Sequence, residues 1–131
     1  MPATADTGTF RRTNFSGWLL TDRDRVLAEL AAQGVTPAYE RLVCEHVTYQ
    51  YPDREAAPDL GTITIRGHAA ADGVQALLVD AGGTIHRNDA GLYHVTLSLA
   101  AGRKPVESVQ LLHQGPVVVL DAPITVAVRA F

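Results

Sequence analysis

Cysteine, long apolar segments and excess positive charge are all scarce in this sequence, and each absence excludes a class of protein. Cys44 is the only cysteine among 131 residues, so these residues cannot form an internal disulfide or a cysteine-based zinc cluster. No apolar run approaches the length of a transmembrane helix, so we expect no membrane partner. The net charge of −3 argues against a general nucleic-acid coat, although a few local cations could still hold a nucleotide or a short RNA end.

The first residues do not have the pattern of a targeting signal. Residues 1–14 are polar and contain Arg11 and Arg12 without an apolar stretch after them, unlike a signal peptide. Small and polar residues dominate residues 1–13, so we expect a flexible tail there. Residues 14–131 have the length of one globular domain. We therefore expect a single cytoplasmic domain, and the sequence indicates no protein partner.

Segments with strand and helix patterns follow one another mostly in hairpin order. The first helix is expected to begin at a Thr21 cap and to stop near Gly34. A short helical piece is expected at residues 37–42, and another helix begins near Pro105. The predicted strands are residues 15–20, 43–49, 62–66, 74–80, 93–99, 117–120 and 124–130. This order predicts an α+β domain whose sheet is mostly antiparallel.

Two of the predicted strands carry the same short pattern, His-Val-Thr, at residues 46–48 and 94–96. Residues two apart on a strand project from the same face, so each histidine points with its threonine. The alternate residues of the second strand are apolar, which places its histidine and threonine on a polar face. The first strand has the same phase, with Cys44 on the histidine side and only Glu45 interrupting the apolar row.

Two histidines on polar faces suit acid–base cleavage of a phosphodiester. One neutral imidazole can take a proton from the attacking oxygen while a protonated one gives a proton to the leaving oxygen. Histidine titrates near neutral pH, so both forms coexist. The hydroxyls of Thr48 and Thr96 can donate hydrogen bonds to the non-bridging phosphate oxygens, where charge builds. Neither role needs a metal or another cofactor. The alternative is that both histidines simply lie on a solvated sheet face.

Paired His-x-Thr-hydrophobic motifs in a small α+β domain resemble the 2H phosphoesterase superfamily. Residues 93–98, Tyr-His-Val-Thr-Leu-Ser, followed by Gly-Arg-Lys-Pro-Val-Glu-Ser at 102–108, carry the most specific likeness. They are similar to the cyclic phosphodiesterase domains of fungal tRNA ligases and of stand-alone bacterial and phage relatives. The resemblance covers roughly residues 15–131 and implies a two-lobed fold with an active cleft between the motif strands. The catalytic residues it implies are His46, Thr48, His94 and Thr96.

The resemblance implies a hydrolase that opens 2′,3′-cyclic phosphates or cleaves other 2′-linked or cyclic nucleotide phosphodiesters, as in RNA repair. The expected partner is therefore a nucleotide or an RNA that carries such a group. The alternative is a module on the same fold that binds a nucleotide or RNA end without turnover. A purely structural domain is a third possibility.

Further residues are candidates for substrate binding. Lys104 and Arg103 follow the second motif strand and could bring positive charge to the phosphate, or form a solvated turn. Ser108 could contribute a hydroxyl to the substrate or begin a helix. Trp18 and Tyr51 could stack on a base, which typically adds about 1–3 kcal/mol.

The remaining chemistry-bearing residues have simpler interpretations. Tyr49 and Tyr93 are expected in the core, and Cys44 is expected to line the sheet and not to act as a nucleophile. A zinc site built from the two motif histidines and one other histidine would lack compact ligand spacing. Three histidines are expected at the surface: His68, His86 and His113.

Overall fold

The computed structural model describes residues 15–51, 55–87 and 91–131, and this part of the chain contains seven strands and two helices. The strands are β1 (Ser16–Leu20), β2 (Arg41–Leu42), β3 (His46–Gln50), β4 (Thr62–Ala71), β5 (Val74–Asp80), β6 (His94–Leu99) and β7 (Val118–Ala130). The helices are α1 (Arg23–Ala32) and α2 (Glu107–Gln114). The tail predicted at residues 1–13 lies outside the described residues.

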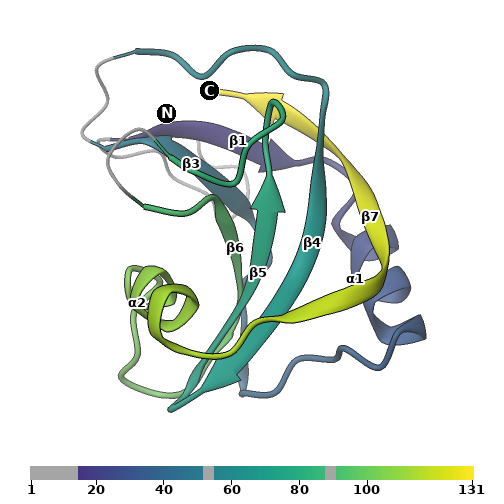
Figure 1. The fold of residues 1–131 in the computed structure, drawn as a ribbon, viewed down its shortest axis with the longest axis vertical. Helices are drawn as coiled ribbons and strands as arrows, with labels where there is room; N and C mark the ends of the chain where they lie inside the picture. Colours follow the sequence, from purple (N-terminus) through teal and green to yellow (C-terminus); the bar gives the residue numbers. More distant parts are fainter. Residues whose placement is uncertain (1–14, 52–54, 88–90) are drawn as a thin grey trace.

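The strands form one antiparallel sheet that closes on itself (Figure 1). The sheet order is β2-β6-β3-β1-β7-β4-β5, and an additional pairing joins β5 to β6. A ring of six strands, β6-β3-β1-β7-β4-β5, therefore forms a barrel, while β2 extends the pairing of β6 beyond β3. The prediction of a mixed α+β, mostly antiparallel domain is confirmed.

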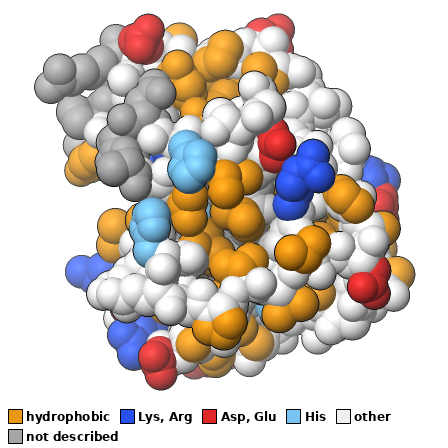
Figure 2. Space-filling view, in the orientation of Figure 1, with side chains coloured by type: hydrophobic (Ala, Val, Ile, Leu, Met, Phe, Trp, Pro, Cys, Tyr) orange, Lys and Arg blue, Asp and Glu red, His pale blue; other side chains and the backbone are white. Residues whose placement is uncertain are grey.

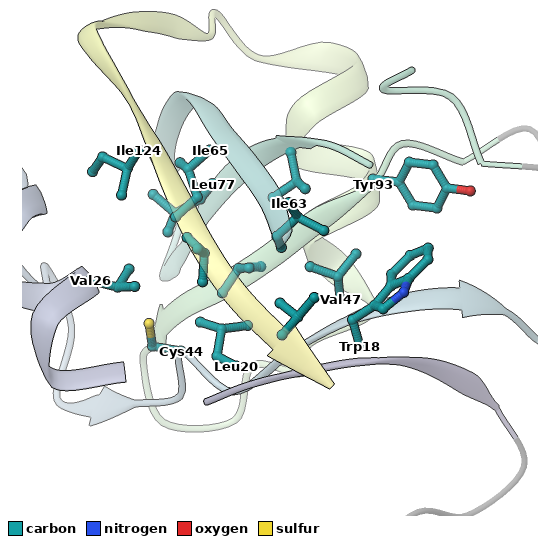
Figure 3. Close-up of a cluster of buried hydrophobic side chains, with 14 of the residues drawn as sticks. Trp18, Leu20, Val26, Cys44, Val47, Ile63, Ile65, Leu77, Tyr93 and Ile124 are labelled. Atoms are coloured by element: carbon teal, nitrogen blue, oxygen red, sulfur yellow. The ribbon is translucent and has the colours of Figure 1, made fainter. Parts of the chain in front are cut away.

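The inside of the barrel is filled by side chains that alternate along the strands. Val47, Ile65, Leu77 and Ile124 are all buried and come from four different strands (Figure 3). Burying each such side chain typically contributes about 1.5–3 kcal/mol relative to leaving it exposed. The alternating pattern that predicted the strands therefore also determines which residues face inward.

The two helices lie on different sides of the barrel (Figure 1). Leu112 of α2 packs on the outer face against Ala69 and Ala76, whose small side chains let the helix approach the sheet. Helix α1 lies beside β7, where Arg25 Nη2 donates to the Thr125 carbonyl and Gln33 exchanges two hydrogen bonds with the Ala122 backbone. Side chains of α1 thus satisfy polar backbone groups of β7 that a neighbouring strand would otherwise satisfy.

Two predicted elements are wrong. Residues 37–42 do not form a helix; they bend and end in β2. Gln75 holds this segment in place by accepting from the Ala38 N–H and donating to the Thr36 carbonyl, each at 2.9 Å. The two strands predicted at 117–120 and 124–130 are one continuous strand, β7. Its register against β4 shifts between Ile65 and Gly67, and this irregularity accommodates Pro123, which cannot donate to a ladder.

The helices of the described residues are α1 and α2, and both are short. Neither one combines the length and the apolar character that crossing a membrane demands.

Candidate active site

The two His-x-Thr motifs lie on neighbouring strands and are paired centre to centre. Val47 of β3 is the partner of Val95 on β6, and both valine side chains are buried. In an antiparallel pair, this register places Thr48 opposite His94, whereas the backbone of Cys44 pairs with Thr96 because the Cys44 N–H donates to the Thr96 carbonyl. Because these four residues flank the inward-facing valines, their side chains share the outer face of the barrel. Two triplets separated by 45 intervening residues, 49–93, thus form one four-residue cluster.

The pairing places the two motif histidines on the same face of neighbouring strands. His46 and His94 occupy diagonal positions, and diagonal neighbours across an antiparallel pair typically lie about 7–8 Å apart. Two histidines so placed can exchange protons with the attacking and leaving oxygens of the same group.

The two histidine rings differ in their contacts at Nδ1: that of His94 makes a hydrogen bond, and that of His46 makes none with the residues that the structure describes. Nδ1 of His94 lies 2.9 Å from the Leu92 carbonyl oxygen, which can only accept a hydrogen bond. The neutral ring therefore carries its proton on Nδ1, and Nε2 is the basic nitrogen. Nδ1 of His46 lies 3.5 Å from Oε1 of Glu45, and the His46 ring packs on Phe15 with 5.0 Å between centroids. The side chain of His46 is 20% exposed.

The two threonines differ in their surroundings. Thr48 is half-buried, whereas Thr96 is only 6% exposed because α2 covers it. The Thr96 hydroxyl lies 2.8 Å from Oγ of Ser108 and 3.5 Å from the Pro105 carbonyl oxygen. Ser108 is fully buried, so its predicted contact with substrate is wrong. Its hydroxyl instead fixes the rotamer of Thr96.

A bulge before β3 changes the predicted phase of the first motif strand. Cys44 has a positive φ of 47°, which reverses the direction of its side chain relative to a regular strand. Figure 3 shows its sulfur in the core near Val26 and Leu20, so the prediction that Cys44 shares the face of His46 is wrong. Desolvation raises the pKa of the thiol to about 11. Cys44 is therefore neither a nucleophile nor a lining residue of the cluster.

Arg23 of α1 stabilises this bulge. Its guanidinium donates from Nε to the Cys44 carbonyl and from Nη2 to the Val43 carbonyl, both at 3.1 Å. The bulge exposes carbonyls that a regular ladder would pair, and the charged donors satisfy them. The start of β3, and with it His46, is thereby fixed to the first helix.

The aromatic residues predicted to stack on a base divide between core and surface. Trp18 is 1% exposed, and its Nε1 donates to the Pro58 carbonyl at 2.8 Å, so the stacking prediction is wrong for this residue. Its ring packs edge-on against Tyr49 and Tyr93, and Tyr93 is buried as predicted. Tyr51 is 56% exposed, just beyond the end of β3, and stays a candidate.

The cations after the second motif strand have different positions. Arg103 pairs with Glu107 at 2.8 Å, and its Cγ lies next to Gly73 in the β4–β5 turn, at the far end of β6 from His94. The structure therefore does not bring Arg103 to the motif cluster. Lys104 precedes Pro105, whose carbonyl oxygen lies 3.5 Å from the Thr96 hydroxyl. Its backbone N–H donates to Glu107, which lowers the pKa of that carboxyl.

Sequence reasoning did not identify three other residues on this face. Leu19 is the partner of both His46 and Arg129, so exposed Arg129 lies two strands from His46 in the same row. Phe131 contacts Phe15 edge-on at 5.5 Å, beside the His46 ring. Register and ring contacts reveal these residues, which no local sequence pattern indicates. Figure 2 shows histidine side chains reaching the surface beside hydrophobic ones on the face it views.

The structure also describes the three histidines outside the two motifs. His86 and His113 are exposed, as predicted. His68 is half-buried, and Gln75 Nε2 lies 3.0 Å from its Nε2, so the prediction of a surface position is wrong. Burial lowers the pKa of His68. Within the described residues, three or more His, Cys, Asp or Glu side chains do not gather anywhere as a metal site would require.

We compared the chain with protein-family models, with curated proteins and with solved structures. None of the three comparisons gives a match.

Proposed function

We propose that this chain is a 2H-type phosphodiesterase that acts without a metal on a 2′,3′-cyclic phosphate, or on a related 2′-linked or cyclic nucleotide phosphodiester, in the cytoplasm. The centre-to-centre pairing of residues 46–48 with residues 94–96 carries the proposal. If these residues only lay on a solvated sheet face, nothing would require the same His-Val-Thr triplet on both strands with its histidine and threonine on the same face. In this proposal the motif strands β3 and β6 mark the boundary between the two lobes of a 2H-like fold.

The proposed reaction uses one histidine as base and the other as acid. A water oxygen attacks phosphorus while one neutral imidazole takes its proton, and the bond from phosphorus to one ribose oxygen breaks. The second imidazole gives a proton to that leaving oxygen. The hydroxyl of Thr48 donates to a non-bridging oxygen, and Thr96 supports its side of the cluster through Ser108.

Hydrolysis of nucleoside 2′,3′-cyclic phosphates by the full chain tests the proposal. We expect His46→Ala and His94→Ala each to lower turnover by about 10²–10⁴-fold, because each removes one proton transfer. The exposed histidine His113 provides the matched control, and His113→Ala is expected to leave turnover unchanged. Wild-type turnover is expected to persist in excess chelator. Turnover that both motif variants retain, or that chelator abolishes, would contradict the proposal.

The same assay separates the enzyme from the binding module. The enzyme is expected to show a bell-shaped dependence of rate on pH, because activity needs one neutral and one protonated imidazole. A panel of cyclic nucleotides, cyclic oligonucleotides and 2′–5′-linked dinucleotides identifies the substrate class. Ligand that binds but is recovered unchanged after long incubation would favour the module.

A further inference from the structure

Gln75 of β5 is 1% exposed, and its contacts fix the orientation of its amide. Oε1 accepts from the Ala38 N–H, and Nε2 donates to the Thr36 carbonyl, each at 2.9 Å. Because the N–H can only donate and the carbonyl can only accept, these contacts decide which amide atom is oxygen and which is nitrogen. The other neighbour of Nε2 is Nε2 of His68, at 3.0 Å. An amide nitrogen only donates, so His68 accepts this hydrogen bond.

The same amide docks a short segment between α1 and β2, residues 36–39, which we call the docked segment. The second hydrogen bond to Oε1 comes from the hydroxyl of Ser98, which is fully buried and accepts from the Tyr39 N–H at 3.2 Å. Both donors and both acceptor positions of Gln75 are thus used. The docked segment continues into β2 and the bulge at Cys44, so these hydrogen bonds also hold the approach to the first motif strand.

Protonation of His68 conflicts with this network. The neutral ring accepts at Nε2 while its proton is on Nδ1, whereas the imidazolium carries a proton on both nitrogens and would face the Gln75 amide donor to donor. Rotating the amide by half a turn would offer the imidazolium an acceptor. It would also turn Nε2 toward the Ala38 N–H and Oε1 toward the Thr36 carbonyl, so both contacts with the docked segment would be lost.

Within the described residues, the groups that face His68 are uncharged. Its sheet partners are Leu77 of β5 and Val118 of β7, and Val118 is 65% exposed, so protons from solvent can reach the half-buried ring. Burial lowers the pKa of His68, and no charge among the described residues adds to this shift. The charged residues nearest in the chain to these groups are exposed or paired with one another, and they are Glu40, Arg41, Arg66, Asp72, Asp80 and Asp121.

We infer that His68 is a pH-sensitive latch: its neutral ring fixes the Gln75 amide in the orientation that docks residues 36–39, and its protonation releases them. This inference does not depend on the proposed catalytic activity. Release takes up one proton, because the ring is neutral in the docked state and regains its ordinary pKa of 6.5 when the segment leaves. The contribution of His68 to docking is therefore fully present above pH 6.5. It is lost as pH falls from 6.5 through the lowered pKa of the docked state.

Hydrogen exchange of the Ala38 and Tyr39 amides in the full chain tests the latch. Their protection factors should fall by about tenfold for each pH unit below 6.5, until the pKa of docked His68 is reached. NMR of the His68 ring measures that pKa in the same sample. The Val79 amide, which donates to the Tyr93 carbonyl within the barrel, should stay protected after the other two exchange. Flat protection factors while His68 titrates, or simultaneous exchange of all three amides, would overturn the inference.

Two substitutions separate the titration of His68 from its shape. His68→Gln offers Gln75 an amide oxygen at every pH, so the protection of the Ala38 amide should persist through the acidic range. His113→Gln removes an exposed histidine of α2 and should leave the wild-type dependence on pH intact. A dependence that survives in His68→Gln would assign it to another group and would refute the latch.

Discussion

Cys44 shows how the backbone conformation of a single residue decides what a side chain can do. Its left-handed conformation turns the thiol into the core and turns Glu45 toward His46. A regular strand would have placed Cys44 on the polar face and Glu45 among apolar side chains. The bulge thus removes one candidate from the site.

The burial of Cys44 predicts how stability depends on alkaline pH. Burial raises the pKa of the thiol from its ordinary value of 9.0 to about 11 in the folded protein. The folded state therefore holds its proton more tightly, so its contribution to the free energy of unfolding is constant below pH 9. That contribution is lost as pH rises from 9 to about 11, and the loss is about 3 kcal/mol. Urea unfolding at several pH values measures it.

Cys44→Ala is the control for this prediction, since it removes the thiol but keeps the other groups that titrate in the same range. The difference between wild type and variant should shrink as pH rises through this interval. A thiol reagent at neutral pH should modify Cys44 only as fast as the protein unfolds. Rapid modification of the native protein would contradict the buried position.

At the scale of elements, β2 and β3 behave as one bent strand along β6. The Val43 and Cys44 N–H groups donate to the Leu97 and Thr96 carbonyls at 2.8 Å, so the pairing continues through the bulge. Arg23 anchors the bend from α1, and α2 covers the other motif strand through Ser108. Each motif is therefore supported by the helix on its own side.

Arg23→Ala is expected to loosen the bulge. Hydrogen bonds from a charged donor typically contribute about 1.5–3 kcal/mol, so the free energy of unfolding should fall by about this amount. Hydrolysis of a cyclic phosphate should fall as well, because His46 would lose its fixed position. Arg66→Ala removes an exposed pair with Asp80 and should cost less than about 1 kcal/mol. Equal effects of the two substitutions would argue against the anchoring role.

At the scale of the whole fold, the described residues form one closed barrel with one main core. The closing pair, β5 with β6, joins the hairpin of β4 and β5 to the strand that carries the second motif. Closure leaves β5 and β6 without open edges where they pair, and side chains from both halves of the chain share the interior. The motif cluster lies at the direct pairing of β3 with β6, which is another of the pairings in this closed ring.

The barrel is expected to unfold in a single transition. Trp18 is the only tryptophan and lies in the core between Tyr49 and Tyr93, so its fluorescence reports on the interior. In urea, Trp18 fluorescence and far-UV circular dichroism should change at the same midpoint. Leu77→Ala should lower the free energy of unfolding by about 2–5 kcal/mol. The urea midpoints of the two signals should fall together. Midpoints that separate would indicate parts that unfold independently.

The sequence by itself determined most of the strands, the phase of the second motif and the α+β class, but not β2 or the continuity of β7. These follow from local spacing: the alternation on residues 94–99 and the stop near Gly34 depend on neighbouring residues only. Tyr93 was predicted in the core for the same reason. The two His-x-Thr triplets were also recognisable from the sequence.

Only the tertiary structure decided which residues of distant segments meet. Strand order brings Val47 opposite Val95, the bulge at Cys44 redirects Glu45, and barrel closure buries Trp18. Ser108 is covered for a similar reason, since α2 folds back onto β6. Pairing register and bulges depend on the free energy of the complete core, and short-range sequence patterns carry little information about it.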